Sequence, residues 1–188
     1  GDSFSVSFRG RTQHNDSYLV YASGALLTPG LRGIGQGGDQ LAAAGAHNYV
    51  IIAHPLFING DLQRLVDART QQGYSVNVVN VIDLYDRYTY GVFDPEAIRA
   101  FIGDAAAQGA EYFLFVGADC YDYRNFKYDC VSFIPTLYRA TGIGDAYTKY
   151  SPVDPAFVDL NGDTVPDRII ARLPVRTTEE LRLMVDKT

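Results

Sequence analysis

The sequence has no tryptophan, one methionine and two cysteines in 188 residues. It also lacks any apolar run close to the roughly 20 residues that a membrane-spanning helix needs. Acidic residues outnumber basic ones by 22 to 16, and the net charge of −6 argues against nucleic acid or an anionic membrane as a partner. A chain of this length buries about 70% of its unfolded surface, so it needs neither a metal nor a covalent staple merely to fold.

Several catalytic motifs are missing as well. There is no GxSxG elbow and no P-loop. The stretch 33–38 contains a GxGxxG match, but it precedes the first strand instead of following one and opening a helix, so we interpret it as a connector. His14, His47 and His54 show no HxxxH spacing. His54 ends a buried strand beside a proline, and a hydrogen-bonded structural role is favoured over a catalytic one.

The two cysteines, Cys120 and Cys130, lie in one aromatic stretch without helical or strand periodicity. Their separation suits a disulfide that contributes up to about 3 kcal/mol if the chain is exported. Two reduced thiols are the alternative. Because neither cysteine has CxxC spacing or a neighbouring histidine, the pattern does not favour metal or redox chemistry.

What the sequence does contain is a series of short apolar runs separated by helical patterns. The run Tyr49–Ala53 is continuous and rich in β-branched residues, which is typical of a central parallel strand covered on both faces. Further strands are expected at 74–81, 111–116 and 168–172. Helices between and after them have capping residues at Asn59, Asp94 and Thr177. This alternation predicts a three-layer α/β fold with a four-stranded, mostly parallel sheet flanked by helices.

The residues before this series form a separate part of the chain. Phe4, Val6 and Phe8 alternate with serines, and a second short strand is expected at 18–21. We interpret residues 1–47 as a β-strand pair and a glycine-rich connector, the tail of a preceding domain. Residues 48–188 are the α/β domain, and we interpret the whole chain as a piece of a longer protein.

The most specific local pattern is an acidic loop. Oxygen donors recur at relative positions 1, 3, 5, 7 and 9: Asp159, Asn161, Asp163, Val165 (through its carbonyl) and Asp167. This spacing is typical of a chain that folds around Ca²⁺. It is not an EF-hand, because Thr164 and Ile170 replace its glycine and glutamate. We expect weak affinity, about 10⁻⁴ M, as in extracellular modules. The alternative is an Asx-rich turn between strands.

Several of these stretches together resemble the gingipain-like cysteine peptidases of peptidase family C25. They are the stretch 49–57 (YVIIAHPLF), the helix start 94–98 (DPEAI), the strand 113–117 (FLFVG), the acidic loop 159–167 and the stretch 170–175 (IARLPV). The resemblance extends over about residues 17–188. The chain departs from the family pattern where Ala118 separates Gly117 from Asp119, and where Ala171 precedes Arg172.

The resemblance implies a caspase-like α/β fold of two subdomains, of which this chain is the first. In the family, the nucleophilic cysteine and its histidine lie in the second subdomain, which is expected to begin near the end of this chain. Neither Cys120 nor Cys130 matches the nucleophile, so no catalytic residue is assigned here.

The resemblance thus suggests the N-terminal, non-catalytic half of a cysteine endopeptidase that is secreted or exposed on a bacterial cell surface. Its partners would be the following catalytic subdomain of the same chain and a peptide or protein substrate. The alternative is a Ca²⁺-binding, non-catalytic adhesion or scaffold module on the same fold.

Overall fold

The computed structural model describes residues 24, 47–123, 126–127, 129–140 and 149–188. The chain divides into two compact units, 1–34 and 35–188, and all described residues except Gly24 belong to the second. The predicted strand pair near the N-terminus and the glycine-rich connector lie outside the described residues. The boundary drawn at residue 47 therefore stays a prediction.

The second unit is built on a four-stranded parallel sheet in the order β2-β1-β3-β6. Its strands are β1 (Tyr49–Ala53), β2 (Val76–Asn80), β3 (Tyr112–Val116) and β6 (Ile169–Leu173). Strand β1 lies in the middle and pairs with β2 on one side and β3 on the other. The predicted parallel sheet is confirmed, and so is the central place of the run that begins at Tyr49.

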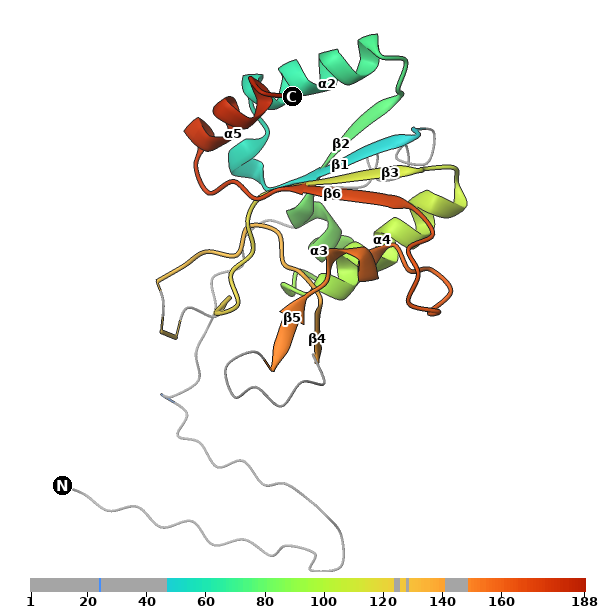
Figure 1. The fold of residues 1–188 in the computed structure, drawn as a ribbon. Coiled ribbons are helices and arrows are strands. Elements are labelled where there is room, and N and C mark those ends of the chain that lie inside the picture. Colours follow the sequence, from blue (N-terminus) through green and yellow to red (C-terminus); the bar gives the residue numbers. More distant parts are fainter. Residues whose placement is uncertain (1–23, 25–46, 124–125, 128, 141–148) are drawn as a thin grey trace, which may run out of the picture. The chain divides into compact units, whose positions relative to one another are not determined.

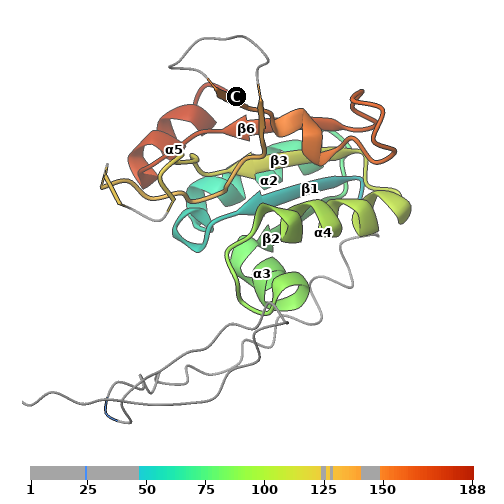
Figure 2. The ribbon, with the colours of Figure 1, turned by 90° about the horizontal axis from the view of Figure 1, so that it is seen from below.

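Helices cover both faces of this sheet (Figures 1 and 2). Helices α2 (Gly60–Gln71) and α5 (Thr178–Val185) lie on one face, and α3 (Val81–Thr89) and α4 (Pro95–Ala107) on the other. The alternation within β1 shows why both faces are dry. Val50 and Ile52 pack into the core beneath α3 and α4, whereas Ile51 and Ala53 pack into the core beneath α2 and α5. The predicted three-layer α/β fold is confirmed.

Local signals set the helix boundaries as the sequence predicts. The Asn59 side chain accepts the N–H groups of Asp61 and Leu62 at the start of α2. Asp94 caps α4 before a proline at the first helical position, and Thr177 with Glu180 forms a complete capping box at α5. These caps satisfy backbone donors that have no partner inside the helix.

The long connection from β3 to β6 is less regular. It contains a small antiparallel pair, β4 (Tyr138–Ala140) and β5 (Tyr150–Pro152), and a 3-10 helix η4 (Asp154–Phe157). These elements were not predicted from the sequence, because they are only three or four residues long. Phe157 in η4 is fully buried and meets Phe115 of β3 edge to face, so the connection packs onto the sheet.

Gly117, directly after β3, is the position where this connection depends on glycine. Its φ of +141° is in the region that side chains disfavour, and a Cβ there would lie 2.8 Å from the Cβ of Phe133. We expect Gly117→Ala to lower the free energy of unfolding by about 2 kcal/mol or more, through overpacking and backbone strain. Urea denaturation measures the loss.

Gly103 in α4 provides the matched control, because nothing lies within 4 Å of a Cβ built there. Gly103→Ala is expected to be neutral or to stabilise the chain by up to about 1 kcal/mol. Equal effects of the two substitutions would contradict the role given to Gly117.

Candidate functional site

The carboxyl edge of the sheet gathers the polar groups that a functional site requires. Strand β1 leads into β2 on one side, while β3 and β6 lie on the other, so the winding direction reverses between β1 and β3. In open α/β sheets, ligands bind outside the carboxyl ends of the strands at such a reversal. His54, Asp119 and Val175 follow β1, β3 and β6 at this edge.

Arg172 of β6 makes the densest set of contacts here. Its guanidinium donates to both Asp154 carboxylate oxygens, at 2.6 and 2.8 Å, and stands over the Phe115 ring, 4.9 Å from its centroid. It also donates to the backbone carbonyls of Gly117, Ile134 and Pro135. The largely buried charge therefore has both a counter-ion and satisfied donors, which is the condition for burying an ion pair.

Asp119 is the polar centre of the segment that follows β3. Its carboxylate accepts the hydroxyl of Ser132 at 2.6 Å and the hydroxyl of Tyr138. Burial, followed by the hydrogen bond to Asp119, raises the pKa of the Tyr138 phenol, so Tyr138 remains a donor at neutral pH. The carboxylate thus fixes two side chains of the β3–β6 connection.

A pocket of about 870 Å³ opens beside Asp119. One wall comes from the segment between the cysteines, including Tyr121 and Phe126, and another from 135–138. Phe93 and Asp94, between α3 and α4, close a further side. Six of the fifteen residues that line it are aromatic and three are aspartates, so the pocket combines apolar rings with a few charged groups.

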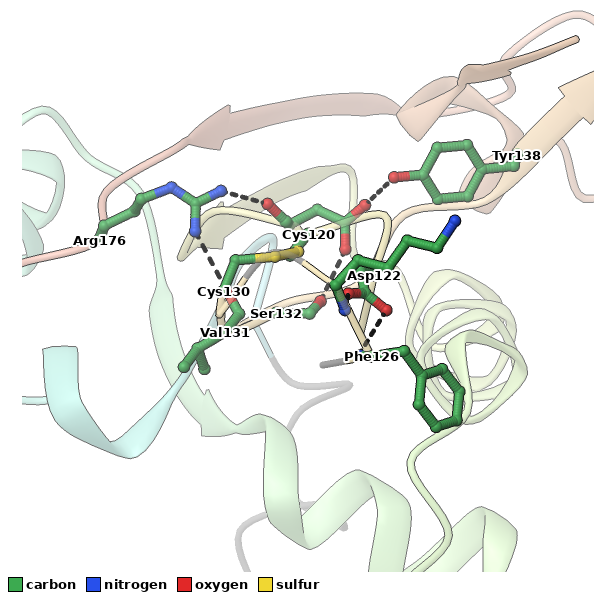
Figure 3. The surroundings of a disulfide bond; sticks show 10 residues. Cys120, Asp122, Phe126, Cys130, Val131, Ser132, Tyr138 and Arg176 are labelled. Atoms are coloured by element: carbon green, nitrogen blue, oxygen red, sulfur yellow. Dashed lines mark hydrogen bonds between the residues drawn. A yellow bond between two sulfur atoms is a disulfide. The ribbon is translucent and has the colours of Figure 1, made fainter. Parts of the chain in front are cut away.

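Cys120 and Cys130 are joined to each other beside this pocket (Figure 3), with their Cα atoms 6.2 Å apart. The structure therefore leaves neither cysteine as a free thiol. A cysteine nucleophile must be a thiolate. While the two cysteines are bonded to each other, neither sulfur is a thiolate.

The acidic loop is closed by its own hydrogen bonds. Asp159, only 2% exposed, accepts the N–H groups of Gly162 and Thr164, and Arg139 lies 3.4 Å from one of its oxygens. Asp163 accepts the N–H of Val165. Asp167 accepts the N–H of Leu160, and Asn161 donates from its amide to Asp163 and Asp167. These are the bonds of an Asx-rich turn.

In the part of the chain that the structure describes, no group of three or more histidine, cysteine, aspartate or glutamate side chains converges on a common metal position. Binding of Ca²⁺ would require the oxygens of the acidic loop to turn from backbone donors toward the ion. The calcium ligands Asp159, Asn161, Asp163, Val165 and Asp167 stay a prediction.

Sequence reasoning missed the residues that organise the carboxyl edge. Asp154 and Arg176 carry no periodic or motif signal. Arg172 is visible in the sequence only as the arginine at the end of the predicted fourth strand. A search for acidic residues within reach of that arginine would have been the one available signal, but Asp154 lies 18 positions away in an irregular stretch.

These features define a class: a helix-covered parallel α/β subdomain with its polar groups at the carboxyl edge. The chain belongs to peptidase family C25, whose sequence pattern matches residues 42–188. That is a family of cysteine peptidases, as the resemblance had suggested. Comparison with curated proteins gives no match.

Solved structures show the same fold. Dimeric latent PorU from Porphyromonas gingivalis matches with a TM-score of 0.59 and 20% identity, over 75% of this chain and 15% of that one. The complex of pro- and mature domains of RgpB, from the same organism, matches with a TM-score of 0.50 and 20% identity, over 74% and 28% of the two chains. This chain therefore spans less than a third of each relative.

No helix among the described residues is long and apolar enough to cross a membrane.

His54 has the structural role that its place in the sequence favoured. Its Nδ1 accepts the N–H of Leu56 at 3.2 Å and so caps the 3-10 helix η3 (Pro55–Phe57), while its ring meets those of Phe57 and Phe133. Nδ1 accepts this bond only when it carries no proton. Burial lowers the pKa of His54 from its usual 6.5, which favours the same neutral form.

Because the pKa of His54 is lower in the folded chain, the free energy of unfolding is expected to decrease as the pH falls. The unfolded chain takes up a proton at His54 near pH 6.5, whereas the folded chain resists it until lower pH. The contribution of His54 is complete above that value and is lost as the pH falls toward the folded pKa. Between about pH 7.5 and about pH 5.5, we expect the urea midpoint to fall more for the wild type than for His54→Asn, which keeps a cap without a titrating group. Equal falls would contradict this.

Proposed function

We propose that this chain is the N-terminal, non-catalytic half of a secreted gingipain-like cysteine endopeptidase, and that it supports a catalytic subdomain following residue 188. The observation that carries the proposal is the use of both cysteines in one bond within a family C25 fold. A half that holds no free thiol can shape and stabilise an active site but does not supply its nucleophile.

The carboxyl edge suits this supporting role. The pocket beside Asp119 opens there, and the groups around it are fixed by the Arg172–Asp154 pair and by the hydroxyls on Asp119. A rigid, preorganised wall holds a peptide substrate in place without further ordering cost. The catalytic subdomain would lie against this edge, and the substrate would be a peptide or protein.

The proposal is tested by assaying peptide cleavage. Under reducing conditions, the chain alone is expected to show no thiol-dependent cleavage of a denatured protein substrate. Thiol-dependent cleavage is cleavage that a thiol-alkylating reagent abolishes. The parent protein, continued beyond Thr188, is expected to cleave that substrate, and its Cys120→Ser/Cys130→Ser variant should still show cleavage that a thiol-alkylating reagent abolishes, because neither residue would be the nucleophile. Cleavage by the isolated chain that is lost in the same double variant would refute the proposal.

The supporting half and the adhesion or scaffold alternative differ in the residues expected beyond Thr188. A histidine–glycine pair and a later cysteine at the end of a strand would be needed for the enzyme, and their absence would favour the scaffold. Both versions are compatible with a calcium site in the loop 159–167.

We propose that this loop binds Ca²⁺ weakly, on the strength of its five oxygen donors at alternate positions. Calorimetric titration is expected to give a dissociation constant of about 10⁻⁴ M for Ca²⁺ and weaker binding of Mg²⁺, which demands stricter octahedral geometry. Asp163→Asn should reduce the affinity, since this exposed carboxylate is a proposed ligand.

Asp67→Asn, on the outer surface of α2, is the matched control and should bind Ca²⁺ as the wild type does. Absence of calcium binding in the wild type, or unchanged affinity in Asp163→Asn, would leave the loop as an Asx-rich turn only.

A further inference from the structure

The outer wall of the pocket is made by the segment that the two cysteines enclose. Five lining residues belong to it: Cys120, Tyr121, Asp122, Tyr123 and Phe126. Tyr123 stacks on Phe93 with ring centroids 5.5 Å apart, and Tyr121 meets Tyr138 edge to face at 5.1 Å. Through these two ring contacts the segment closes the pocket against the α3–α4 connection and β4.

The two ends of this segment are held together just outside the cysteines. Arg176 donates to the backbone carbonyl of Asp119 at 2.6 Å and to that of Val131 at 3.2 Å, which lie next to Cys120 and Cys130 (Figure 3). The Ser132 hydroxyl also donates to the Asp119 carboxylate. Arg176 and the disulfide therefore close the same neck, defined as 118–119 and 131–134, at adjacent positions.

The neck has further backbone support that the disulfide does not provide. The Phe133 N–H donates to the carbonyl of Ala118 at 2.9 Å, and the Ala118 N–H donates to the carbonyl of Val175 at 2.8 Å. These bonds tie both sides of the neck to the segment that leads from β6 to α5. Breaking a sulfur–sulfur bond removes none of them.

Two hydrogen bonds of Asp122 lie within the wall and do not reach the neck. Asp122 accepts the N–H groups of Phe126 and Lys127, four and five residues further on, so these bonds are local to the wall. The Phe126 side chain is 77% exposed and that of Tyr121 64% exposed. The disulfide joins the two ends of this wall, across a sequence separation of 10. Cross-linking restricts the conformations that such a loop samples.

We infer that the Cys120–Cys130 bond is a redox-sensitive latch on the outer wall of the pocket, and that Arg176 keeps the neck closed in both redox states. Cys120 is buried, but Cys130 is partly exposed, and a small thiol can reach the bond from that side. A dithiol transfers two electrons and two protons, the sulfur–sulfur bond breaks to give two cysteine thiols, and the dithiol becomes its cyclic disulfide. The pocket is then complete only in an oxidising compartment.

This inference goes beyond the proposed function, because it concerns a pocket within this chain and requires no second subdomain. It is tested on the whole chain by amide hydrogen exchange before and after reduction with dithiothreitol. Reduction is expected to speed exchange at Phe126 and Lys127 about tenfold or more, while Phe133 and the strand β3 stay protected. Cys120→Ser/Cys130→Ser should reproduce this pattern without a reductant.

The variant Arg176→Met separates the contribution of Arg176 to the closed neck from that of the disulfide. Its oxidised form should keep Phe133 protected, whereas its reduced form should lose much of that protection, because only the backbone bonds and the Ser132–Asp119 hydrogen bond then hold the neck. Arg182→Met, an exposed arginine of α5 paired with Glu179, is the matched control and should behave as the wild type. If Arg176→Met does not fold, Arg176→Lys, which cannot span both carbonyls, takes its place.

Three results would overturn the inference. Two free thiols in chain purified from an oxidising compartment would show that the latch does not form. Unchanged exchange at Phe126 and Lys127 after reduction would show that the wall does not depend on it. Loss of protection at Phe133 in the reduced wild type would show that Arg176 does not hold the neck.

Discussion

The architecture of the carboxyl edge depends on the ion pair between Arg172 and Asp154. An arginine on an edge strand would ordinarily extend into solvent, but this one points inward and uses five hydrogen bonds to join three separate segments. Removing one partner of such a pair leaves a buried charge uncompensated, at a cost of about 3 kcal/mol or more. The pair and the hydrogen bonds around it therefore hold Gly117, residues 134–136 and Asp154 together at this edge.

Gly117 and Asp119 show how this constraint is transmitted along the chain. Arg172 binds the carbonyl of Gly117, and the close approach of Phe133 requires that residue to be glycine. Two positions later, Asp119 faces Ser132 and Tyr138, and its own carbonyl meets Arg176. Two arginines from the end of β6 and the residues just after it thus hold the β3–β6 connection on both sides of the disulfide.

Sequence reasoning succeeded where the determinants are local and failed where they are distant. The run at Tyr49, the caps at Asn59 and Asp94 and the box at Thr177 each depend on neighbours within a few residues, so the sheet and the helices could be predicted. Arg172 lies in a strand that was predicted, but its partner Asp154 lies in a segment without periodicity, and their pairing depends on where η4 packs against the sheet. The pocket depends on that packing and was invisible for the same reason.

The chemistry of the described residues supports the assignment of a supporting role. Here Asp119 is held by two hydroxyls, Asp154 by Arg172 and Thr136, and Asp159 by the backbone of its own loop. The Nδ1 atom of His54 accepts the hydrogen bond that caps η3, and the two cysteines are bonded to each other. Groups bonded in this way form a preorganised surface at the carboxyl edge of the sheet, which is what the proposed supporting role requires.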